Sequence, residues 1–189
     1  GGLSAGGAVM RPGDEAELAE IVRGANVPLV LRGGGTRGIG GAAAGEVLET
    51  SGLSGVRLYE PGALTLVVGA GTPLAEVEGL LAAEGQRLAF DPPDMRGLLG
   101  REGVSTIGGV VAVNASGSRR VQAGACRDSL IGVRFVDGTG TVVRNGGRVM
   151  KNVTGIDLVK LMAGSHGTLG VLTEVAFKVL PAPEAVATL

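Results

Sequence analysis

Hydrophobic positions recur at helical spacing in two segments of the first ninety residues. Residues 15–24 place their apolar side chains on one face, and Asp14 stands where a helix N-cap is expected. A second apolar stripe predicts a helix over residues 74–83, with Thr72 as its cap. Pro73 would take the first helical position, where the missing N–H costs nothing. The first helix is interpreted as scaffold.

Apolar runs of strand length flank and follow these helices. The predicted strands cover residues 29–32, 46–50, 64–68, 131–136, 141–144 and 171–180. Residues 137–140, Asp-Gly-Thr-Gly, join two of them in a tight turn and so predict a hairpin. A short helix is expected over 156–163. The double proline at 92–93 resists regular structure, so we place a boundary between two lobes near residue 91.

A glycine-rich segment follows the first predicted strand. Residues 33–41 read Gly-Gly-Gly-Thr-Arg-Gly-Ile-Gly-Gly and contain no acidic side chain. Glycine adopts conformations that let backbone N–H groups converge, and converging N–H groups bind anionic oxygens. Arg32 and Arg37 add positive charge on either side. The segment therefore predicts a pyrophosphate site and a nucleotide cofactor.

Two other interpretations of this segment stay open. Its spacing also fits the Gly-x-Gly-x-x-Gly pattern of a nicotinamide-binding Rossmann fold. That fold needs a helix to begin at the third glycine, and residues 39–45 contain three glycines, which disfavour a helix. The segment would otherwise be a plain surface loop. A phosphate-binding fold of another type is the favoured interpretation.

Composition and charge exclude several classes of function. Seventeen basic and 18 acidic residues give a net charge of −1, and 44% of the residues are hydrophobic. With three Phe, one Tyr and no Trp, the chain lacks both a basic surface and aromatic platforms for bases. We expect no nucleic-acid partner. No apolar run is long enough to span a membrane, and the first residues lack the features of a signal peptide. An intracellular, reducing compartment is expected.

The single cysteine and the single histidine limit the available chemistry. One cysteine excludes a disulfide framework and a cysteine-rich metal or iron–sulfur site. Cys126, next to Arg127, is either an activated thiol or, as we favour, a small buried residue. His166 is either a general base or, as we favour, part of a structural turn.

Other small or polar stretches also have two interpretations. Residues 69–71, Gly-Ala-Gly between a strand and a helix, suit either an anion or, as we favour, close packing. Lys151 and Asp157 form either a polar site or a solvated ion pair. Residues 119–120, both arginine, either contact phosphate or face water.

Five motifs follow one another along the chain. They are Arg32-Gly33-Gly34-Gly35-Thr36, Asp91-Pro92-Pro93 with Thr106-Ile107-Gly108-Gly109, Gly124-x-x-Arg127-Asp128-x-x-Ile131-Gly132, Lys151-Asn152-Val153-Thr154-Gly155-x-Asp157-Leu158, and Gly164-Ser165-x-Gly167-Thr168-Leu169-Gly170-x-x-Thr173. In this order they resemble the vanillyl-alcohol-oxidase (PCMH) type of FAD-binding domain. The last three match the branch with glycolate oxidase and D-lactate dehydrogenase, above all the FAD-binding subunits of glycolate oxidase. The resemblance covers about residues 5–183.

This resemblance implies an α+β fold, a two-lobed PCMH-type domain with FAD in the cleft between lobes at 1–90 and 91–189. The first lobe would hold the pyrophosphate loop, and no cap or substrate domain is expected within this chain. The implied FAD-binding residues are Gly33, Gly34, Gly35, Thr36, Arg37 and Gly38 at the pyrophosphate, Thr106, Gly108, Gly109, Asn114, Ser116 and Gly117 along the flavin and its ribityl chain, Gly124, Arg127, Gly170 and Val171 around the rest, and Pro93 of the second FAD segment.

The expected mode of FAD attachment follows from one difference between this chain and the wider family. Several members of the wider family attach the flavin through a histidine in or near the first loop, and this chain has none there. We therefore expect non-covalent FAD. The base and the cation for a substrate carboxylate usually come from outside the FAD domain, so no catalytic residue is assigned and no metal is expected.

The resemblance also implies an activity and partners. We expect the FAD-binding subunit or domain of a glycolate oxidase-like enzyme that oxidises a 2-hydroxy acid. Electrons would pass to a homologous flavoprotein subunit and an iron–sulfur subunit. The location would be cytoplasmic, or peripheral at the inner membrane through those subunits, and the isolated chain should turn over little substrate. The alternatives are a non-catalytic cofactor-bearing or structural subunit and, with less support, a Rossmann-type nicotinamide module.

Overall fold

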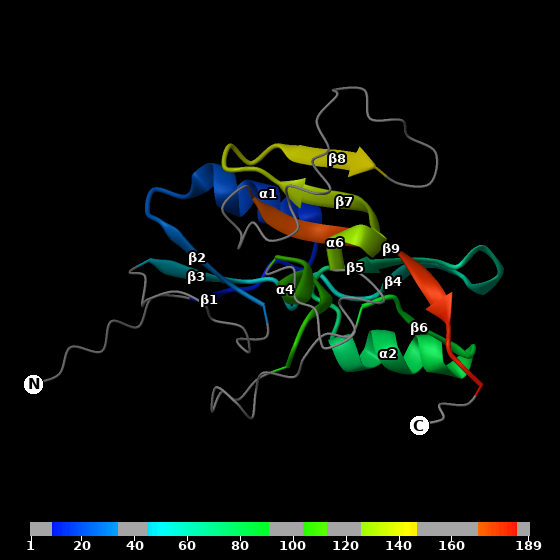
Figure 1. Cartoon of the computed structure of the whole chain (residues 1–189). Coiled ribbons are helices and arrows are strands. Elements are labelled where there is room, and N and C mark those ends of the chain that lie inside the picture. The colour runs from blue at the N-terminus through cyan, green and yellow to red at the C-terminus, as the bar shows by residue number, and fades with distance from the viewer. Residues whose placement is uncertain (1–8, 34–44, 91–103, 113–125, 147–169, 185–189) are drawn as a thin grey trace, which may run out of the picture.

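The computed structural model describes residues 9–33, 45–90, 104–112, 126–146 and 170–184 of the 189-residue chain. Within these ranges the chain forms two β-sheets and a small number of helices (Figure 1). None of the described helices has the length and apolarity needed to cross a membrane.

The smaller sheet is parallel and opens the fold. Its strands are β1 (Val9–Met10), β2 (Leu29–Arg32) and β3 (Glu46–Glu49), in the order β1-β3-β2. Helix α1 (Glu15–Gly24) connects β1 to β2, as a parallel arrangement requires. The predicted helix over 15–24 and the predicted strand over 29–32 are confirmed, whereas β1 was not predicted.

The larger sheet has six strands, and each of its pairs is antiparallel. They are β4 (Val56–Glu60), β5 (Thr65–Gly69), β6 (Gln86–Leu88), β7 (Leu130–Val136), β8 (Val142–Gly146) and β9 (Val171–Pro181). The order is β4-β5-β9-β7-β8, and β6 pairs with the end of β9. The predicted hairpin is the pair β7 and β8.

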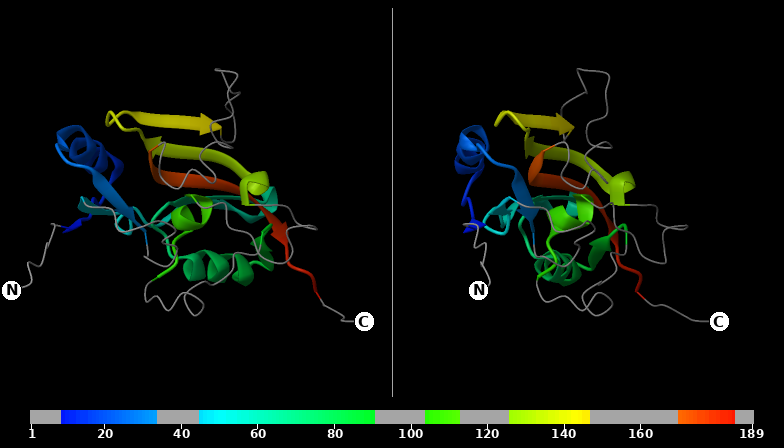
Figure 2. Two further views of the ribbon diagram at one scale, coloured as in Figure 1. Left: turned by 60° about the vertical axis from the view of Figure 1, so that its left-hand side comes forward. Right: turned by 90° about the vertical axis from the view of Figure 1, so that its left-hand side faces the viewer.

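Helices α2 (Leu74–Ala83) and α4 (Ile107–Ala112) lie on one side of this sheet (Figure 2). Their apolar side chains join those of β5 and β9 in the main core, where Phe177 is fully buried. The Phe177 and Phe90 rings stand 5.6 Å apart. Two short helical turns, η1 (Pro61–Ala63) and α6 (Cys126–Ser129), complete the described elements. The helix predicted over 156–163 lies outside the described residues.

A second apolar cluster joins the two sheets. Leu18 and Ala19 of α1 pack with Leu48 of β3 and with Val136 and Val171 of the larger sheet. The hairpin turn at residues 137–140 also packs against α1. A Cβ added at Gly140 would lie only 2.3 Å from Cγ of Arg23 in that helix. Helix α1 therefore packs against both sheets.

The division between the two sheets differs from the predicted lobe boundary. Strands β4, β5 and β6 belong to the sheet that β7, β8 and β9 complete, so the sheets divide between residues 49 and 56 rather than near residue 91. Strand β6, before the double proline in sequence, and strand β7, after it, both pair with β9. The lobes at 1–90 and 91–189 stay a prediction, and β9 joins strands from both of these ranges in one sheet.

Candidate functional site

The end of β2 meets the beginning of α4. A Cβ on Gly33 would lie 2.7 Å from Oγ1 of Thr106, a distance that real Cβ atoms essentially never show, and 3.8 Å from Oγ1 of Thr50. Position 33 therefore accepts only glycine without a shift of Thr106. Gly33 and Thr106 belong to two segments that are predicted to bind the same ligand. They are adjacent in the structure, although they lie far apart in the sequence.

Thr106 is held at this place by the start of α2. It forms an isolated antiparallel bridge with Pro73, while Leu74 N donates to the Ser105 carbonyl at 2.7 Å. The Thr106 side chain is buried, and its Oγ1 accepts the Gly109 N–H at 3.3 Å. Within the described part of the chain, the Thr106 hydroxyl hydrogen has no acceptor. It is thus a buried donor beside the first residue of the glycine segment.

The backbone of Gly108 lies close against the backbone of Ala70. Its N–H donates to the Ala70 carbonyl at 2.8 Å, and a Cβ there would lie 2.7 Å from the same oxygen. In the neighbouring turn, Gly71 N donates to Leu53 O at 2.9 Å and Gly69 N to Gly55 O at 2.8 Å. The favoured packing interpretation of residues 69–71 is confirmed, because their N–H groups already have partners.

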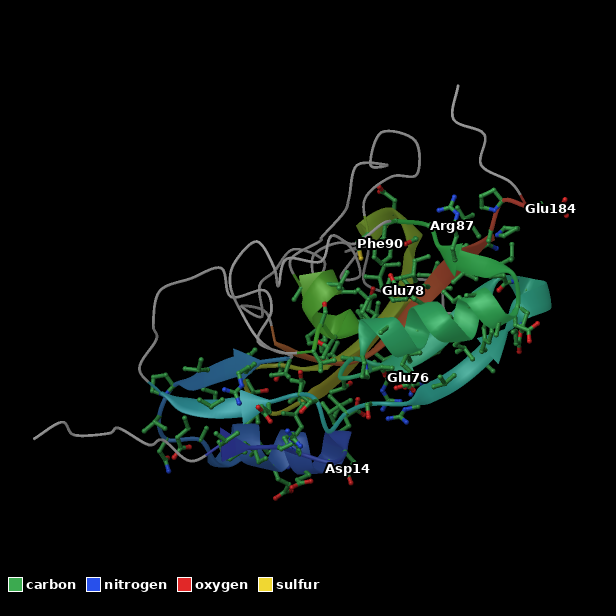
Figure 3. All side chains as sticks on the ribbon, turned by 90° about the horizontal axis from the view of Figure 1, so that it is seen from below. Asp14, Glu76, Glu78, Arg87, Phe90 and Glu184 are labelled. Atoms are coloured by element: carbon green, nitrogen blue, oxygen red, sulfur yellow. The ribbon has the colours of Figure 1, made fainter. Side chains whose placement is uncertain are left out.

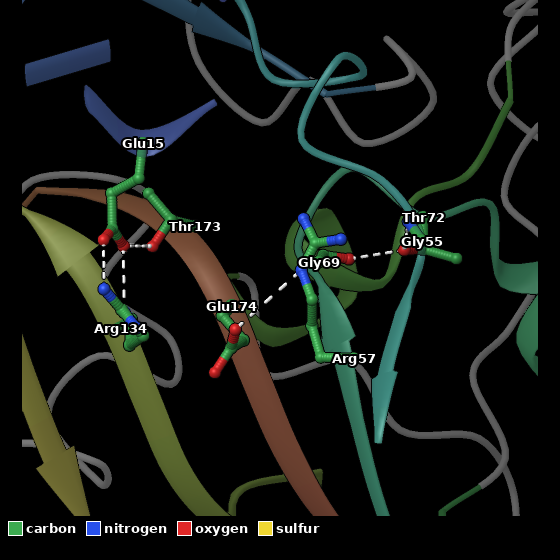
Figure 4. Close-up of polar contacts among 8 residues, drawn as sticks. All are labelled: Glu15, Gly55, Arg57, Gly69, Thr72, Arg134, Thr173 and Glu174. Atoms are coloured by element: carbon green, nitrogen blue, oxygen red, sulfur yellow. Dashed lines mark hydrogen bonds and ion pairs between the residues drawn. The ribbon is translucent and has the colours of Figure 1, made fainter. Parts of the chain in front are cut away.

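The predicted cap of α2 is wrong. The hydroxyl of Thr72 donates to the Gly69 carbonyl at 2.6 Å and accepts the Gly55 N–H at 2.9 Å (Figure 4). The N-cap is Pro73, which makes no side-chain hydrogen bond. The fully buried hydroxyl is used by the tertiary turn rather than by the helix.

The predicted cap of α1 is confirmed. Asp14 lies at the beginning of the helix and accepts the Glu17 N–H at 2.8 Å (Figure 3). Glu17 in turn accepts the Gly13 N–H at 2.8 Å. Figure 3 also shows the acidic side chains Glu76 and Glu78 on α2, on the exposed part of the molecule.

An ion-pair cluster lies at the carboxyl ends of the three parallel strands. Oε2 of Glu49 accepts from Nε and Nη2 of Arg11 at 3.0 and 2.8 Å, and its Oε1 accepts from Nε of Arg32 at 3.0 Å and from Nη2 of the same group. The hydrogen bonds from Arg32 and then Arg11 lower the pKa of Glu49, against a smaller opposing effect of burial. Glu49 therefore neutralises part of the positive charge of Arg32, because it shares its own charge between two arginines. The cluster as a whole keeps one positive charge.

A second polar cluster connects α1 to the larger sheet (Figure 4). Glu15 pairs with the Arg134 guanidinium on β7, and its Oε2 accepts the Thr173 hydroxyl of β9 at 2.6 Å. Arg57 and Glu174 form a looser pair at 4.0 Å. The contacts of Glu15 fix α1 on the larger sheet, whereas the Arg57–Glu174 pair lies within that sheet.

Gly170 and Val171 stand at the start of β9. A Cβ on Gly170 would lie 2.5 Å from the Val136 carbonyl. Val171 pairs with Val136, and its buried side chain belongs to the cluster that contains Leu18 and Leu48.

The remaining predicted site residues are only partly covered. Cys126 is fully buried, which confirms the favoured interpretation of that residue. Arg127 lies in α6, but its side chain is outside the described part. Gly34, Gly35, Thr36, Arg37, Gly38, Pro93, Asn114, Ser116, Gly117 and Gly124, and with them Arg119, Arg120, Lys151, Asp157 and His166, lie outside the described residues. Among the described residues, no group of three His, Cys, Asp or Glu side chains is placed to hold a metal ion.

Three residues of this region were missed by the sequence analysis. Glu49, Thr50 and Arg11 gain their positions only through the parallel pairing of β1 and β2 with β3. The alternation of polar and apolar residues predicted strand 46–50 but carries no signal of its neighbours.

Comparison with known proteins places this arrangement among flavoproteins. Residues 7–146 match the family described as FAD binding domain. The chain is 42% identical to glycolate oxidase subunit GlcE of Escherichia coli K12, over 84% of this chain and 44% of that protein. It is 35% identical to glycolate oxidase subunit GlcD of Bacillus subtilis, over 96% and 38%, and 31% identical to D-lactate dehydrogenase of Archaeoglobus fulgidus, over 92% and 38%. The chain thus spans less than half the length of these relatives.

A solved structure agrees with the sequence matches. The structure of alkyldihydroxyacetonephosphate synthase superposes with a TM-score of 0.74 at 26% identity. The match covers 94% of this chain and 32% of that one. The predicted α+β fold class is confirmed.

Proposed function

This chain belongs to the FAD binding domain family of oxidoreductases, and we propose that it carries the FAD of an enzyme that oxidises a 2-hydroxy acid. The observation that supports this most directly is the contact between Gly33 and Thr106. A strand end without a side chain and a buried hydroxyl donor are suited to a phosphate-containing ligand that approaches the backbone closely.

The described residues fit an FAD site in charge as well as in shape. The strand ends beside Gly33 keep one net positive charge after Glu49 has paired with Arg11 and Arg32. Ligands of sheets with parallel strands commonly bind beyond the carboxyl ends of those strands. When bound, FAD accepts the two electrons that leave a 2-hydroxy acid as it becomes a 2-oxo acid. The chain's own residues bind and orient it.

We further propose the residues that hold the cofactor. The proposed contacts are Gly33, Gly34, Gly35, Thr36, Arg37, Gly38, Pro93, Thr106, Gly108, Gly109, Asn114, Ser116, Gly117, Gly124, Arg127, Gly170 and Val171. For Gly108 and Val171 the contribution would come from the backbone or from shaping the wall, because one packs on Ala70 and the other on the core. Attachment is proposed to be non-covalent, since the glycine segment holds no histidine.

The names of the relatives support the substrate class. Glycolate and D-lactate, which appear in those names, are both small 2-hydroxy acids. Two relatives are named as subunits of glycolate oxidase, which supports a multi-subunit enzyme. The proposed partners are a homologous flavoprotein subunit and an iron–sulfur subunit that takes the electrons onward. The proposed location is cytoplasmic, or peripheral at the inner membrane through those subunits.

A second candidate function is a non-catalytic subunit that carries FAD or supports a catalytic partner. It is favoured by one observation: this chain is similar both to GlcE and to GlcD, which are named as different subunits. In that arrangement the substrate would be oxidised on the partner.

An absorption spectrum tests cofactor binding first. The protein that carries this chain should be purified, desalted, and measured before and after acid precipitation. A flavin spectrum that moves entirely to the supernatant is the expected result. Chromophore that stays in the pellet would refute non-covalent attachment, and protein that neither holds nor takes up FAD would refute the assignment.

Anaerobic bleaching separates the two functions. The flavin of this chain should lose its absorbance when glycolate or D-lactate is added to the complete enzyme. If it bleaches only when the partner flavoprotein is active, the non-catalytic function is the correct one. Succinate, which lacks the 2-hydroxyl group, serves as the matched control and should leave the spectrum unchanged.

A further inference from the structure

Glu49 holds both of the arginines that flank it at one edge of the smaller sheet. It is the last residue of the central strand β3, Arg32 is the last residue of β2, and Arg11 directly follows β1. Because the three strands are parallel, all three side chains lie at their carboxyl ends. In the register of the sheet, Arg32 and Glu49 are direct neighbours.

The two carboxylate oxygens of Glu49 bind one arginine each. Each oxygen of Glu49 accepts two hydrogen bonds from a single guanidinium, one from Nε and one from Nη2. The Glu49 side chain is only 11% exposed, whereas those of Arg11 and Arg32 are 62% and 50% exposed. The acid is thus an inner anchor, and the guanidinium groups are oriented around it. Charge-assisted pairs of this kind fix direction as well as distance.

The same short segment also holds the backbone of Arg32. Thr50, the residue after Glu49, donates its N–H to the Arg32 carbonyl at 3.0 Å. That carbonyl belongs to the peptide that leads into Gly33, and Gly33 lies close to the hydroxyl groups of Thr50 and Thr106. Residues 49 and 50 therefore fix the side chain and the backbone at the point where the glycine segment leaves the sheet.

We propose that Glu49 is a positioning residue for the cofactor: by holding Arg32, it fixes the end of β2 at Gly33, where the glycine segment begins. Glu49 itself does not contact FAD. The inference rests on the proposed function, because it assumes that this segment binds the pyrophosphate. A binding group is only as well placed as the residues that support it.

The test is FAD affinity in matched variants. Glu49→Gln keeps the shape but loses the charge, and it should raise the FAD Kd about tenfold, the scale typical of residues that orient a binding group. Glu49→Asp keeps the charge and should recover part of the affinity. Glu174→Gln alters a separate acid–arginine pair, between Glu174 on β9 and Arg57 at 4.0 Å, and should leave the Kd unchanged. Flavin fluorescence of the purified apoprotein, titrated with FAD, measures each value.

A double-variant cycle tests whether Glu49 acts through Arg32. Arg32→Gln should raise the Kd by a similar factor, and Glu49→Gln combined with Arg32→Gln should add little further. Full additivity would overturn the proposal. The visible circular dichroism of bound flavin should change in both single variants, which a general loss of stability would not produce.

Two results distinguish this inference from the proposed function. If the unaltered protein binds FAD and Glu49→Gln binds it equally well while melting at a lower temperature, Glu49 is only structural. If the unaltered protein binds no FAD, the function itself has failed. Should Glu49→Gln not fold, Arg32→Gln decides the question, because Glu49 then stays paired with Arg11. A folded Arg32→Gln protein with unchanged FAD affinity would also refute the proposal.

Discussion

The hydroxyl of Thr106 occupies the space that a side chain at Gly33 would need, since a Cβ there would lie 2.7 Å from Oγ1. We expect Gly33→Ala to push the strand end and the start of α4 apart. FAD affinity should fall at least about tenfold, because the methyl group displaces the buried hydroxyl beside the glycine segment. The measurement is the FAD Kd, with far-ultraviolet circular dichroism to establish folding.

A compensating variant makes this prediction specific. Gly33→Ala combined with Thr106→Ala removes the clashing oxygen and should recover part of the affinity, whereas combination with Thr106→Ser should not. Gly62→Ala is the matched control, because a Cβ at Gly62 meets nothing within 4 Å. Equal losses in the two double variants would contradict the clash.

Glu49 gives the protein a dependence on acid. The hydrogen bonds from Arg32 and Arg11 lower its pKa in the folded state, whereas the unfolded chain keeps the ordinary value near 4.5. The unfolded state then binds the proton first, so the stabilisation is complete above that pH and is lost as the pH falls through the folded pKa. Between about pH 5 and 3 the free energy of unfolding should fall more steeply in the unaltered protein than in Glu49→Gln. Urea unfolding at a series of pH values measures this.

Asp137 provides the comparison for that experiment. Hydrogen bonds from the Thr139 hydroxyl first, and then from the Thr141 backbone, lower its pKa in the exposed hairpin turn. Asp137→Asn should flatten the same acid slope, but less, because water screens an exposed group. It should leave the FAD Kd unchanged. A larger effect at Asp137 than at Glu49 would contradict the assignment.

The contact between Glu15 and Thr173 should contribute to stability. Thr173→Val removes the hydroxyl that donates to Glu15 at 2.6 Å and should cost about 1 kcal/mol of unfolding free energy. Thr173→Ser retains the hydroxyl and should cost less. Glu20→Gln breaks only an exposed pair with Arg23 on α1 and should cost under about 0.5 kcal/mol. If this exposed pair cost as much as the buried one, the role of Glu15 would be refuted.

Two glycines should respond in opposite directions to alanine. Gly79 lies inside α2 with nothing within 4 Å of its Cβ position, so Gly79→Ala should stabilise the protein by about 1 kcal/mol. Gly140 has φ +81° in the hairpin turn and would place a Cβ 2.3 Å from a carbon of Arg23. Gly140→Ala should destabilise by more than about 1 kcal/mol. Thermal unfolding of the two variants compares these effects directly.

Local sequence patterns predicted the long elements well. Helix 74–83 and the strands that became β2, β3, β5, β7, β8 and β9 carry strong periodicity or turn signals, and each formed within about two residues of its predicted limits. The elements that were missed, β1, β4, η1, β6, α4 and α6, have six residues or fewer. They depend on contacts with residues far away in the sequence, which a short stretch of sequence does not reveal. Ile107 of α4 donates its N–H to the Thr72 carbonyl, and β6 pairs with β9.

The candidate site was predictable in part for a related reason. Glycines and the absence of acids marked Gly33 and the Thr106 segment as places where a ligand approaches the backbone. Their mutual contact and the role of Glu49 arise from the pairing of parallel strands. Because a polar residue at a strand end has the same local pattern whatever its neighbours are, sequence alone could not distinguish Glu49 from a solvated acid.

Strand β9 has a consequence for how the protein is made. It pairs with β5, β6 and β7, and so it supplies the centre of the larger sheet from the late part of the sequence, after residue 170. During synthesis, β5 and β7 leave the ribosome with open edges and must wait for their shared neighbour. Such an intermediate exposes unpaired backbone groups, which favour association between chains. We therefore expect nascent chains released before residue 171 to aggregate, and folding to depend on chaperones until β9 has emerged.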